Sequence, residues 1–246
     1  MASFVASDFG FMKLSVIIPV YNEKSTISEV IDRVKAVDIP KEIIVVDDGS
    51  RDGTTEVLKQ KLANEQILTV HTSLINIGKG AAVRIGIEYA AGDITIIQDA
   101  DLELDPQEYH QIVTSIESGK CDVVYGSRFL GRGYFRHYRN IPLASRFGNW
   151  VLAAVVRIFW GVKITDEATS YKAFKTSFLK SIPLKCTGFE FCPEITAKVL
   201  NKKKKIAEVP ISYHPRTVAE GKKVQWKDGI KALWTLFKYR FLEKDD

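Results

Sequence analysis

The chain has 246 residues, of which 46% are hydrophobic and 26% charged, and its formal net charge is +5 at pH 7. This length and composition fit one folded domain with a full-sized core and exclude a disordered chain. The positive charge favours anionic partners such as phosphates or an anionic membrane surface. The basic residues are scattered and form no known nucleic-acid motif, so we expect no nucleic-acid partner.

Short β-branched apolar runs alternate with helical patterns through the first half of the chain. We predict strands at residues 14–19, 42–46, 66–71, 94–98 and 122–125, with helices at residues 25–37, 52–62, 79–90 and 106–118. Such alternation is typical of an α/β fold, Rossmann-like, with a mostly parallel sheet flanked by helices. Ligands bind such sheets beyond the carboxyl ends of the strands, so the loops there are the candidate site.

The second half of the chain is less regular. Its pattern predicts helices near residues 144–160, 193–200 and 226–241, and strands near residues 171–174 and 206–209. Because no repeat and no linker rich in Pro, Gly or Ser separates the halves, we expect a single domain over residues 12–246. Residues 1–11 form an N-terminal extension.

Cysteine use and hydropathy point to the cytosol. Cys121, Cys186 and Cys192 form neither a CxxC pair nor a disulfide framework, which is typical of reduced thiols. No apolar run reaches the roughly 20 residues of a membrane helix, and the N-terminal extension lacks the basic start of a signal peptide. We therefore expect a cytoplasmic protein whose membrane contact is peripheral, at the cytosolic face.

Polar residues follow the first two predicted strands. Asp47 and Asp48 end the second strand, where adjacent carboxylates can accept hydrogen bonds from a nucleobase or from ribose hydroxyls. Asp52, a few residues later, serves equally well as a helix N-cap, and its role stays open. The glycine-rich turn at residues 76–80 lets backbone amides approach a phosphate, and Lys79 adds a mobile positive charge.

Two carboxylates one residue apart, Asp99 and Asp101, follow the predicted strand at residues 94–98. Such a pair can coordinate a hard divalent cation, which would bridge a diphosphate and neutralise its charge. The alternative is a solvated acidic turn that caps the helix beginning at Pro106. Because the pair follows a buried strand, in register with the other loop motifs, we predict a metal site.

Together these motifs resemble the inverting, GT-A-fold family of nucleotide-sugar glycosyltransferases. The chain is most similar to the branch of dolichyl-phosphate mannose synthases and polyprenyl-phosphate glucosyltransferases. Eight stretches carry the resemblance in order along the chain, namely VIIPVYNE, EIIVVDDGSRDGT, NIGKGAAVRIGI, QDADLELDP, YGSRF, ITDEATSYKAF, FEFCPEITAKV and YHPRTVAEGKKVQWKDG. It implies a nucleotide-sugar-binding half at residues 12–130 and an acceptor-binding half at residues 131–246, with an amphipathic C-terminal helix.

The resemblance also assigns the donor site. The residues that would hold the nucleoside are Pro19, Tyr21, Glu23, Asp47 and Asp48. Asp99 and Asp101 would bind Mg²⁺ or Mn²⁺ at the diphosphate. Glu103 would be a further metal ligand, where mannose synthases often carry Gln, and this difference leaves the nucleotide open.

The resemblance also assigns roles to cationic residues and to the acceptor site. Arg128 would contact an acceptor phosphate. Arg216 and Lys223 would close over the donor diphosphate from a loop at residues 217–223. A polyprenyl phosphate is already anionic and needs no general base, whereas a hydroxyl acceptor needs a carboxylate such as Asp166 or Glu167. The alternative role of these two carboxylates is to orient the acceptor loop.

We therefore expect a hexosyltransferase that moves mannose or glucose from GDP-mannose or UDP-glucose to a polyprenyl or dolichyl phosphate, with inversion. Transfer to a saccharide or another hydroxyl is the alternative, and a catalytically silent binding protein is a further one. An oxidoreductase would carry a glycine fingerprint after its first strand, where this chain has PVYNE. The helix at residues 226–241, or a separate anchoring subunit, would hold the enzyme at the membrane surface. The alternative for this helix is that it packs on the core.

Overall fold

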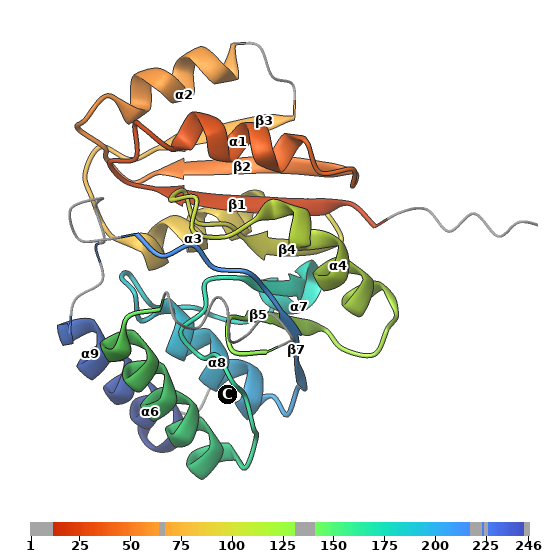
Figure 1. The fold of residues 1–246 in the computed structure, drawn as a ribbon, viewed down its shortest axis with the longest axis vertical. Coiled ribbons are helices and arrows are strands. Elements are labelled where there is room, and N and C mark those ends of the chain that lie inside the picture. Colours follow the sequence, from red (N-terminus) through yellow and green to blue (C-terminus); the bar gives the residue numbers. More distant parts are fainter. Residues whose placement is uncertain (1–11, 64–66, 131–140, 217–222, 224–225, 244–246) are drawn as a thin grey trace, which may run out of the picture.

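The computed structural model describes residues 12–63, 67–130, 141–216, 223 and 226–243 (Figure 1). The N-terminal extension expected at residues 1–11 lies outside these residues. So does most of the loop expected to close over the donor, residues 217–222.

A seven-stranded sheet forms the centre of the molecule, with strand order β3-β2-β1-β4-β6-β5-β7. The strands are β1 (Leu14–Val20), β2 (Lys41–Asp47), β3 (Leu68–Thr72), β4 (Ile94–Ile97), β5 (Val123–Ser127), β6 (Lys172–Lys175) and β7 (Ile206–Pro210). β6 is antiparallel to both of its neighbours, β4 and β5, and the other pairings are parallel. The expected mostly parallel α/β sheet is therefore confirmed.

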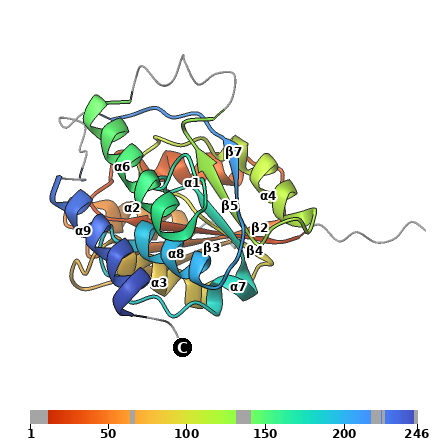
Figure 2. The same ribbon diagram turned by 90° about the horizontal axis from the view of Figure 1, so that it is seen from below.

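Helices cover both faces of the sheet (Figures 1 and 2). One face carries α1 (Ile27–Lys35), α2 (Thr54–Leu62) and α4 (Tyr109–Glu117), the last preceded by the 3-10 turn η1 (Pro106–Glu108). The other face carries α3 (Lys79–Tyr89), α7 (Thr176–Lys180) and α8 (Phe191–Asn201). An outer pair, α6 (Leu143–Trp160) and α9 (Trp226–Phe237), packs on this second face, and the π-helical turn η3 (Lys238–Leu242) follows α9.

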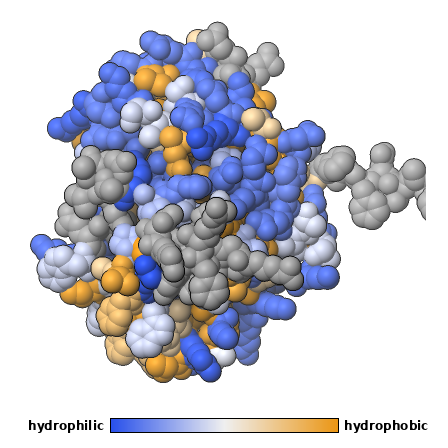
Figure 3. Space-filling view, viewed as in Figure 1, coloured by the Kyte–Doolittle hydropathy of each residue, from blue (hydrophilic) through white to orange (hydrophobic). Residues whose placement is uncertain are grey.

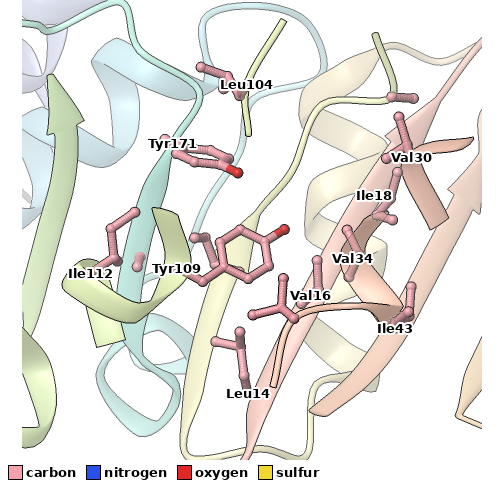
Figure 4. Packing of buried hydrophobic residues seen from close by; sticks show 14 of the residues in the cluster. Leu14, Val16, Ile18, Val30, Val34, Ile43, Leu104, Tyr109, Ile112 and Tyr171 are labelled. Carbon is pink, nitrogen blue, oxygen red and sulfur yellow. The ribbon is translucent and has the colours of Figure 1, made fainter. Parts of the chain in front are cut away.

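Alternation along the strands divides the core into two layers. Val16 and Ile18 of β1 point toward α1 and α4, as Figure 4 shows, whereas Ile17 between them points toward α3. All three are fully buried. Gly86 lets α3 lie directly on the sheet, because a Cβ at this position would come within 2.4 Å of Ile17 Cγ2.

The second half departs from its expected pattern in two places. The strand expected near residues 171–174 is β6, and it reverses the direction of the sheet between β4 and β5. The short helix α7, which no sequence pattern indicated, follows it at once. A five-residue helix is too short to show helical periodicity, so sequence reasoning missed it.

Candidate active site

The loops that carry the predicted site residues meet at one edge of the sheet. β1, β2, β4, β5 and β7 run in the same direction, so their carboxyl ends share this edge. Asp48, Asp99 and Arg128 all follow such ends. The segment after β7, residues 211–216, then crosses the same edge toward β1 (Figure 1).

The two aspartates after β2 hold the backbone of neighbouring loops. Asp47 is fully buried, and its two oxygens accept from the Ser50 N–H at 3.0 Å and the Thr55 hydroxyl at 2.5 Å. Asp48 accepts the N–H groups of Ile77 at 2.8 Å and Gly78 at 2.7 Å. Both carboxylates therefore shape the loops at this end of β2, where the resemblance would place the nucleoside.

The turn before α3 depends on a glycine. Gly78 has φ +121°, in the region that favours glycine, and a Cβ there would lie 2.4 Å from the carbonyl oxygen of Thr187. This turn directs Lys79, the first residue of α3, toward β4. The Lys79 ammonium lies 2.5 Å from Asp99 Oδ1 and also donates to the Ser170 hydroxyl at 2.9 Å. Lys79 is therefore paired with a predicted metal ligand.

A network of buried polar groups around Gln98 fixes the end of β4. Gln98 Oε1 accepts the hydroxyls of Tyr109 and Tyr171, both at 2.7 Å, and all three residues are buried. The Gln98 amide donates to the carbonyl oxygen of Asp99 at 3.0 Å. This network holds the backbone from which the carboxylate pair projects.

Arg216 lies at the centre of the predicted donor site. Its guanidinium forms a two-pronged ion pair with Glu23, at 2.9 and 3.0 Å, and reaches Asp101 Oδ2 at 3.4 Å. Lys223 joins the same cluster through Glu23, at 2.7 Å, and through the carbonyl oxygen of Tyr21. Although burial acts in the opposite direction, the two cations lower the pKa of Glu23. Pro19 is buried within β1, so it supports this strand end from inside the sheet.

Asp101 carries charge that its neighbours compensate incompletely. Burial, with the charges of Asp99 and Glu103, raises the pKa of Asp101 to about 7. A hard divalent cation prefers carboxylate oxygens, and it would supply the missing positive charge, so Asp99 and Asp101 fit Mg²⁺ or Mn²⁺. Among the described residues, however, no three acidic, His or Cys side chains converge as a metal site. Both oxygens of Glu103 accept hydrogen bonds, one from the Tyr213 hydroxyl and one from the Arg216 backbone N–H.

Arg128, at the end of β5, is held by Asp166. The fully buried carboxylate accepts Arg128 Nε at 2.7 Å, Nη2 at 2.8 Å and the backbone N–H at 3.0 Å. Against the effect of burial, Asp166 raises the pKa of Arg128 above its usual range. Glu208 of β7 in turn accepts the backbone N–H groups of Thr165, at 2.9 Å, and Asp166, at 3.0 Å. Glu167 lies next to this pair, fully buried, and its burial raises its pKa.

Sequence reasoning missed three residues of this arrangement. Ser170 bonds Lys79, Glu208 fixes the loop of Asp166, and Tyr213 joins Glu103 to Arg128. Ser170 and Tyr213 stand inside motifs that the resemblance covers, so those motifs were the available signal. Glu208 lies in a plain strand pattern, and nothing in the sequence marks it.

Comparison with known proteins identifies the family. The family model described as Glycosyl transferase family 2 matches residues 15–182. The chain is 31% identical over 215 residues to a dolichol-phosphate mannosyltransferase of Pyrococcus furiosus, covering 86% of this chain and 59% of that protein. It is 29% identical over 211 residues to a dodecaprenyl-phosphate galacturonate synthase of Rhizobium johnstonii, covering 83% of this chain and 60% of that protein. The chain thus spans about three fifths of these relatives.

Solved structures agree on the fold. A glucosyl-3-phosphoglycerate synthase from Mycobacterium tuberculosis, crystallised with Mn²⁺, UDP and glucosyl-3-phosphoglycerate, matches with a TM-score of 0.68 at 21% identity. The match covers 95% of this chain and 82% of that one, and it confirms the expected GT-A-type fold as a single domain. With strand-end loops in the predicted places and a family model that matches more than half of its length, the chain belongs to glycosyl transferase family 2.

Proposed function

We propose that this protein transfers a hexose from a nucleotide sugar to the phosphate of a polyprenyl or dolichyl lipid at a membrane surface, with inversion at the anomeric carbon. The donor is GDP-mannose or UDP-glucose. Relatives named for transfer to dolichol phosphate and dodecaprenyl phosphate support this lipid class. The further support comes from the charges of the site.

One observation favours a phosphate acceptor over a hydroxyl. A hydroxyl acceptor needs a carboxylate that is free to take its proton. Of the two candidates, Asp166 is bound on both oxygens by Arg128, and Glu167 is fully buried. A lipid phosphate is already anionic, needs no base and is attracted by the Arg128 guanidinium.

On the donor side, the cationic groups of the site support the departure of a diphosphate. Asp99 and Asp101 would hold Mg²⁺ or Mn²⁺, which would add positive charge where the diphosphate leaves. Arg216 and Lys223 flank this place, and Arg216 Nε has no hydrogen-bond acceptor among the described residues. A phosphate oxygen is the kind of acceptor that this buried N–H lacks. The carboxylates of Glu23 and Asp101 keep the side chain extended toward the donor until then.

The outer helices offer a surface for the lipid. Within the described part of the chain no helix combines the length and hydropathy needed to cross a bilayer. Instead, apolar side chains gather over α6 and α9 at the lower end of the molecule (Figure 3). Exposed members at helical spacing are Leu143, Phe147 and Trp150 on α6, and Trp226, Ile230, Trp234, Phe237 and Phe241 on α9 and η3. α9 begins just three residues after Lys223, so this face adjoins the donor site.

Product analysis with labelled donors tests the proposal. The purified chain would be incubated with Mn²⁺, polyprenyl phosphate in detergent and either labelled GDP-mannose or labelled UDP-glucose. We expect one of the two labels to pass into the organic phase, since the product is a lipid. Label that passes into a water-soluble saccharide would contradict the lipid acceptor, and label recovered solely as intact donor would contradict the enzyme assignment.

A further inference from the structure

Glu103 occupies both of its carboxylate oxygens with one short segment of the chain. Oε2 accepts the Tyr213 hydroxyl at 2.8 Å, and Oε1 accepts the backbone N–H of Arg216 at 2.8 Å. The backbone carbonyl of Glu103 accepts the N–H of His214 at 2.9 Å. One acidic residue therefore binds three residues of the 211–216 segment, and its side chain is 15% exposed.

The backbone before Glu103 adopts an uncommon conformation to make these contacts. Leu102 has φ +61°, in the left-handed region that residues other than glycine enter at a cost of about 1–2 kcal/mol. The resulting turn also lets Asp101 Oδ1 accept the N–H of Glu103 at 3.1 Å. The turn thus directs the Glu103 side chain to the 211–216 segment.

The 211–216 segment connects the two halves of the site. It leaves β7 with the Ile211 N–H bound to the carbonyl oxygen of Ser127, at 3.0 Å, beside Arg128. It ends at Arg216, whose guanidinium lies on Glu23 at the end of β1. Between these points Tyr213 lies 94% buried, with its ring 5.0 Å from the Arg128 guanidinium. Tyr213 thus touches the group expected at the acceptor, while its hydroxyl is bound to Glu103 beside the donor carboxylates.

We propose that Glu103 is a positioning residue that fastens the 211–216 segment across the site, and that Tyr213 links it to Arg128. In this assignment the two oxygens of Glu103 serve the segment and not a metal ion. The inference rests on the proposed function for the roles of Arg216 and Arg128. The contacts themselves can be tested without turnover.

Limited trypsin digestion measures how firmly the segment is fastened. Trypsin cleaves after Arg216, and the rate at this bond, followed by mass spectrometry, reports how often the segment leaves the site. Glu103→Ala removes two acceptors, so we expect cleavage at least about fivefold faster, and Tyr213→Phe, which loses one bond, at least about twofold faster. Glu103→Gln is the matched control, since its amide can accept from Arg216 N–H and donate to the Tyr213 hydroxyl; it should stay within about twofold of the wild-type rate.

A double-mutant cycle tests whether the two side chains act through one bond. If they do, adding Tyr213→Phe to Glu103→Ala causes no further acceleration. Multiplied effects would overturn the link through Tyr213, and wild-type cleavage of both Glu103→Ala and Tyr213→Phe would overturn the positioning role. Should Glu103→Ala fail to fold, the comparison of Tyr213→Phe with Glu103→Gln still decides.

Mn²⁺ binding separates positioning from ligation. The free Mn²⁺ signal in electron paramagnetic resonance would be followed with GDP or with UDP present. If Glu103 is a positioning residue, Tyr213→Phe weakens the ternary complex in the same direction as Glu103→Ala, because both loosen the segment that carries Arg216. If Glu103 is a ligand, Glu103→Ala weakens it and Tyr213→Phe leaves it unchanged, which would overturn the proposal. Since neither readout requires transfer, a failed transfer assay would count against the proposed function and leave this inference standing.

Discussion

Asp101 sits among more negative charge than its neighbours neutralise. It accepts hydrogen bonds from the Glu103 N–H at 3.1 Å and from Arg216 at 3.4 Å, while Asp99 and Glu103 lie close by. A buried carboxylate in this position is costly to ionise unless a cation binds. A bound cation would therefore stabilise the ionised form of Asp101. In the protein without a cation, we expect replacing Asp101 by a neutral residue to be tolerated.

Asp101→Asn should abolish metal-dependent binding without harming the fold. We expect a melting temperature no lower than that of the wild type, because the amide relieves repulsion from Asp99 and Glu103. Mn²⁺ with GDP or UDP should raise the melting temperature of the wild type, and a ligand at one hundred times its dissociation constant adds about 2.7 kcal/mol. Differential scanning fluorimetry of both proteins, with and without these ligands, checks this. An equal rise in the variant would contradict the role of Asp101.

Loss of the Arg128–Asp166 ion pair should impair the use of the acceptor and not of the donor. Arg128→Ala leaves a buried carboxylate without its partner, and losing one member of such a pair costs about 3–5 kcal/mol of stability. Arg128→Lys keeps the charge but loses the two-pronged geometry. We expect Arg128→Lys to raise the KM for polyprenyl phosphate at least about tenfold, with little change in the KM for the nucleotide sugar. Steady-state kinetics with each substrate varied in turn would show it, and a defect confined to the donor would contradict the assignment.

At the scale of helices and strands, α3 depends on a close contact with β1. Gly86 brings its backbone so near that an added methyl group would overlap Ile17 Cγ2. Gly148 of α6, in contrast, has open space where a Cβ would project. Substitution by alanine should therefore lower the free energy of unfolding at Gly86 and raise it at Gly148.

Gly86→Ala should destabilise the protein by about 1–3 kcal/mol, since overpacking outweighs the gain in helix propensity. Gly148→Ala should stabilise it by about 0.5–1 kcal/mol, because the gain in propensity meets no clash. Chemical denaturation of the two variants beside the wild type measures both free energies of unfolding. A stabilised Gly86→Ala protein would mean that α3 does not lie on Ile17 as described.

Sequence patterns predicted most of these elements because apolar periodicity reports which face of an element is buried. The strand at residues 14–19 and the helix near residues 144–160 were expected within one residue at each end. Strand direction leaves no such trace, so the antiparallel place of β6 came from the structure. Roles were harder still. Asp47 and Tyr213 act through bonds to residues distant in sequence or to turns, and a single sequence shows residue types without their partners.

Over the whole molecule, exposed basic residues and exposed apolar side chains occur together on the outer helices. The net charge of +5 favours an anionic surface, and Arg157, Lys227, Lys231 and Arg240 are exposed on α6, α9 and η3 beside the apolar side chains. A helix with aromatic residues on one side and basic residues on the flanks binds at the boundary of lipid headgroups and acyl chains. The anionic headgroups add about 1 kcal/mol for each nearby Lys or Arg.

Vesicle binding should therefore depend on both lipid charge and the aromatic side chains of α6 and α9. We expect the purified chain to sediment with vesicles rich in phosphatidylglycerol, to bind less well to pure phosphatidylcholine, and to be released as salt is added, because salt screens the charges. Trp150→Ser and Trp234→Ser, at positions 65% and 57% exposed, should each lower the affinity about tenfold or more.

Leu74→Ser is the matched control for these two variants. Leu74 is 97% exposed, but it lies in the loop between β3 and α3 and belongs to neither α6 nor α9. If α6 and α9 bind the lipid surface, this replacement of an exposed apolar residue by Ser leaves vesicle binding at the wild-type level. If binding is non-specific and hydrophobic, Leu74→Ser lowers it as the tryptophan variants do. Loss of binding in all three proteins would therefore contradict a specific role of α6 and α9 at the lipid surface. Loss in the tryptophan variants alone would mean that α6 and α9 face the bilayer. The candidate active site would then lie near the bilayer too, because Lys223 and the start of α9 are adjacent.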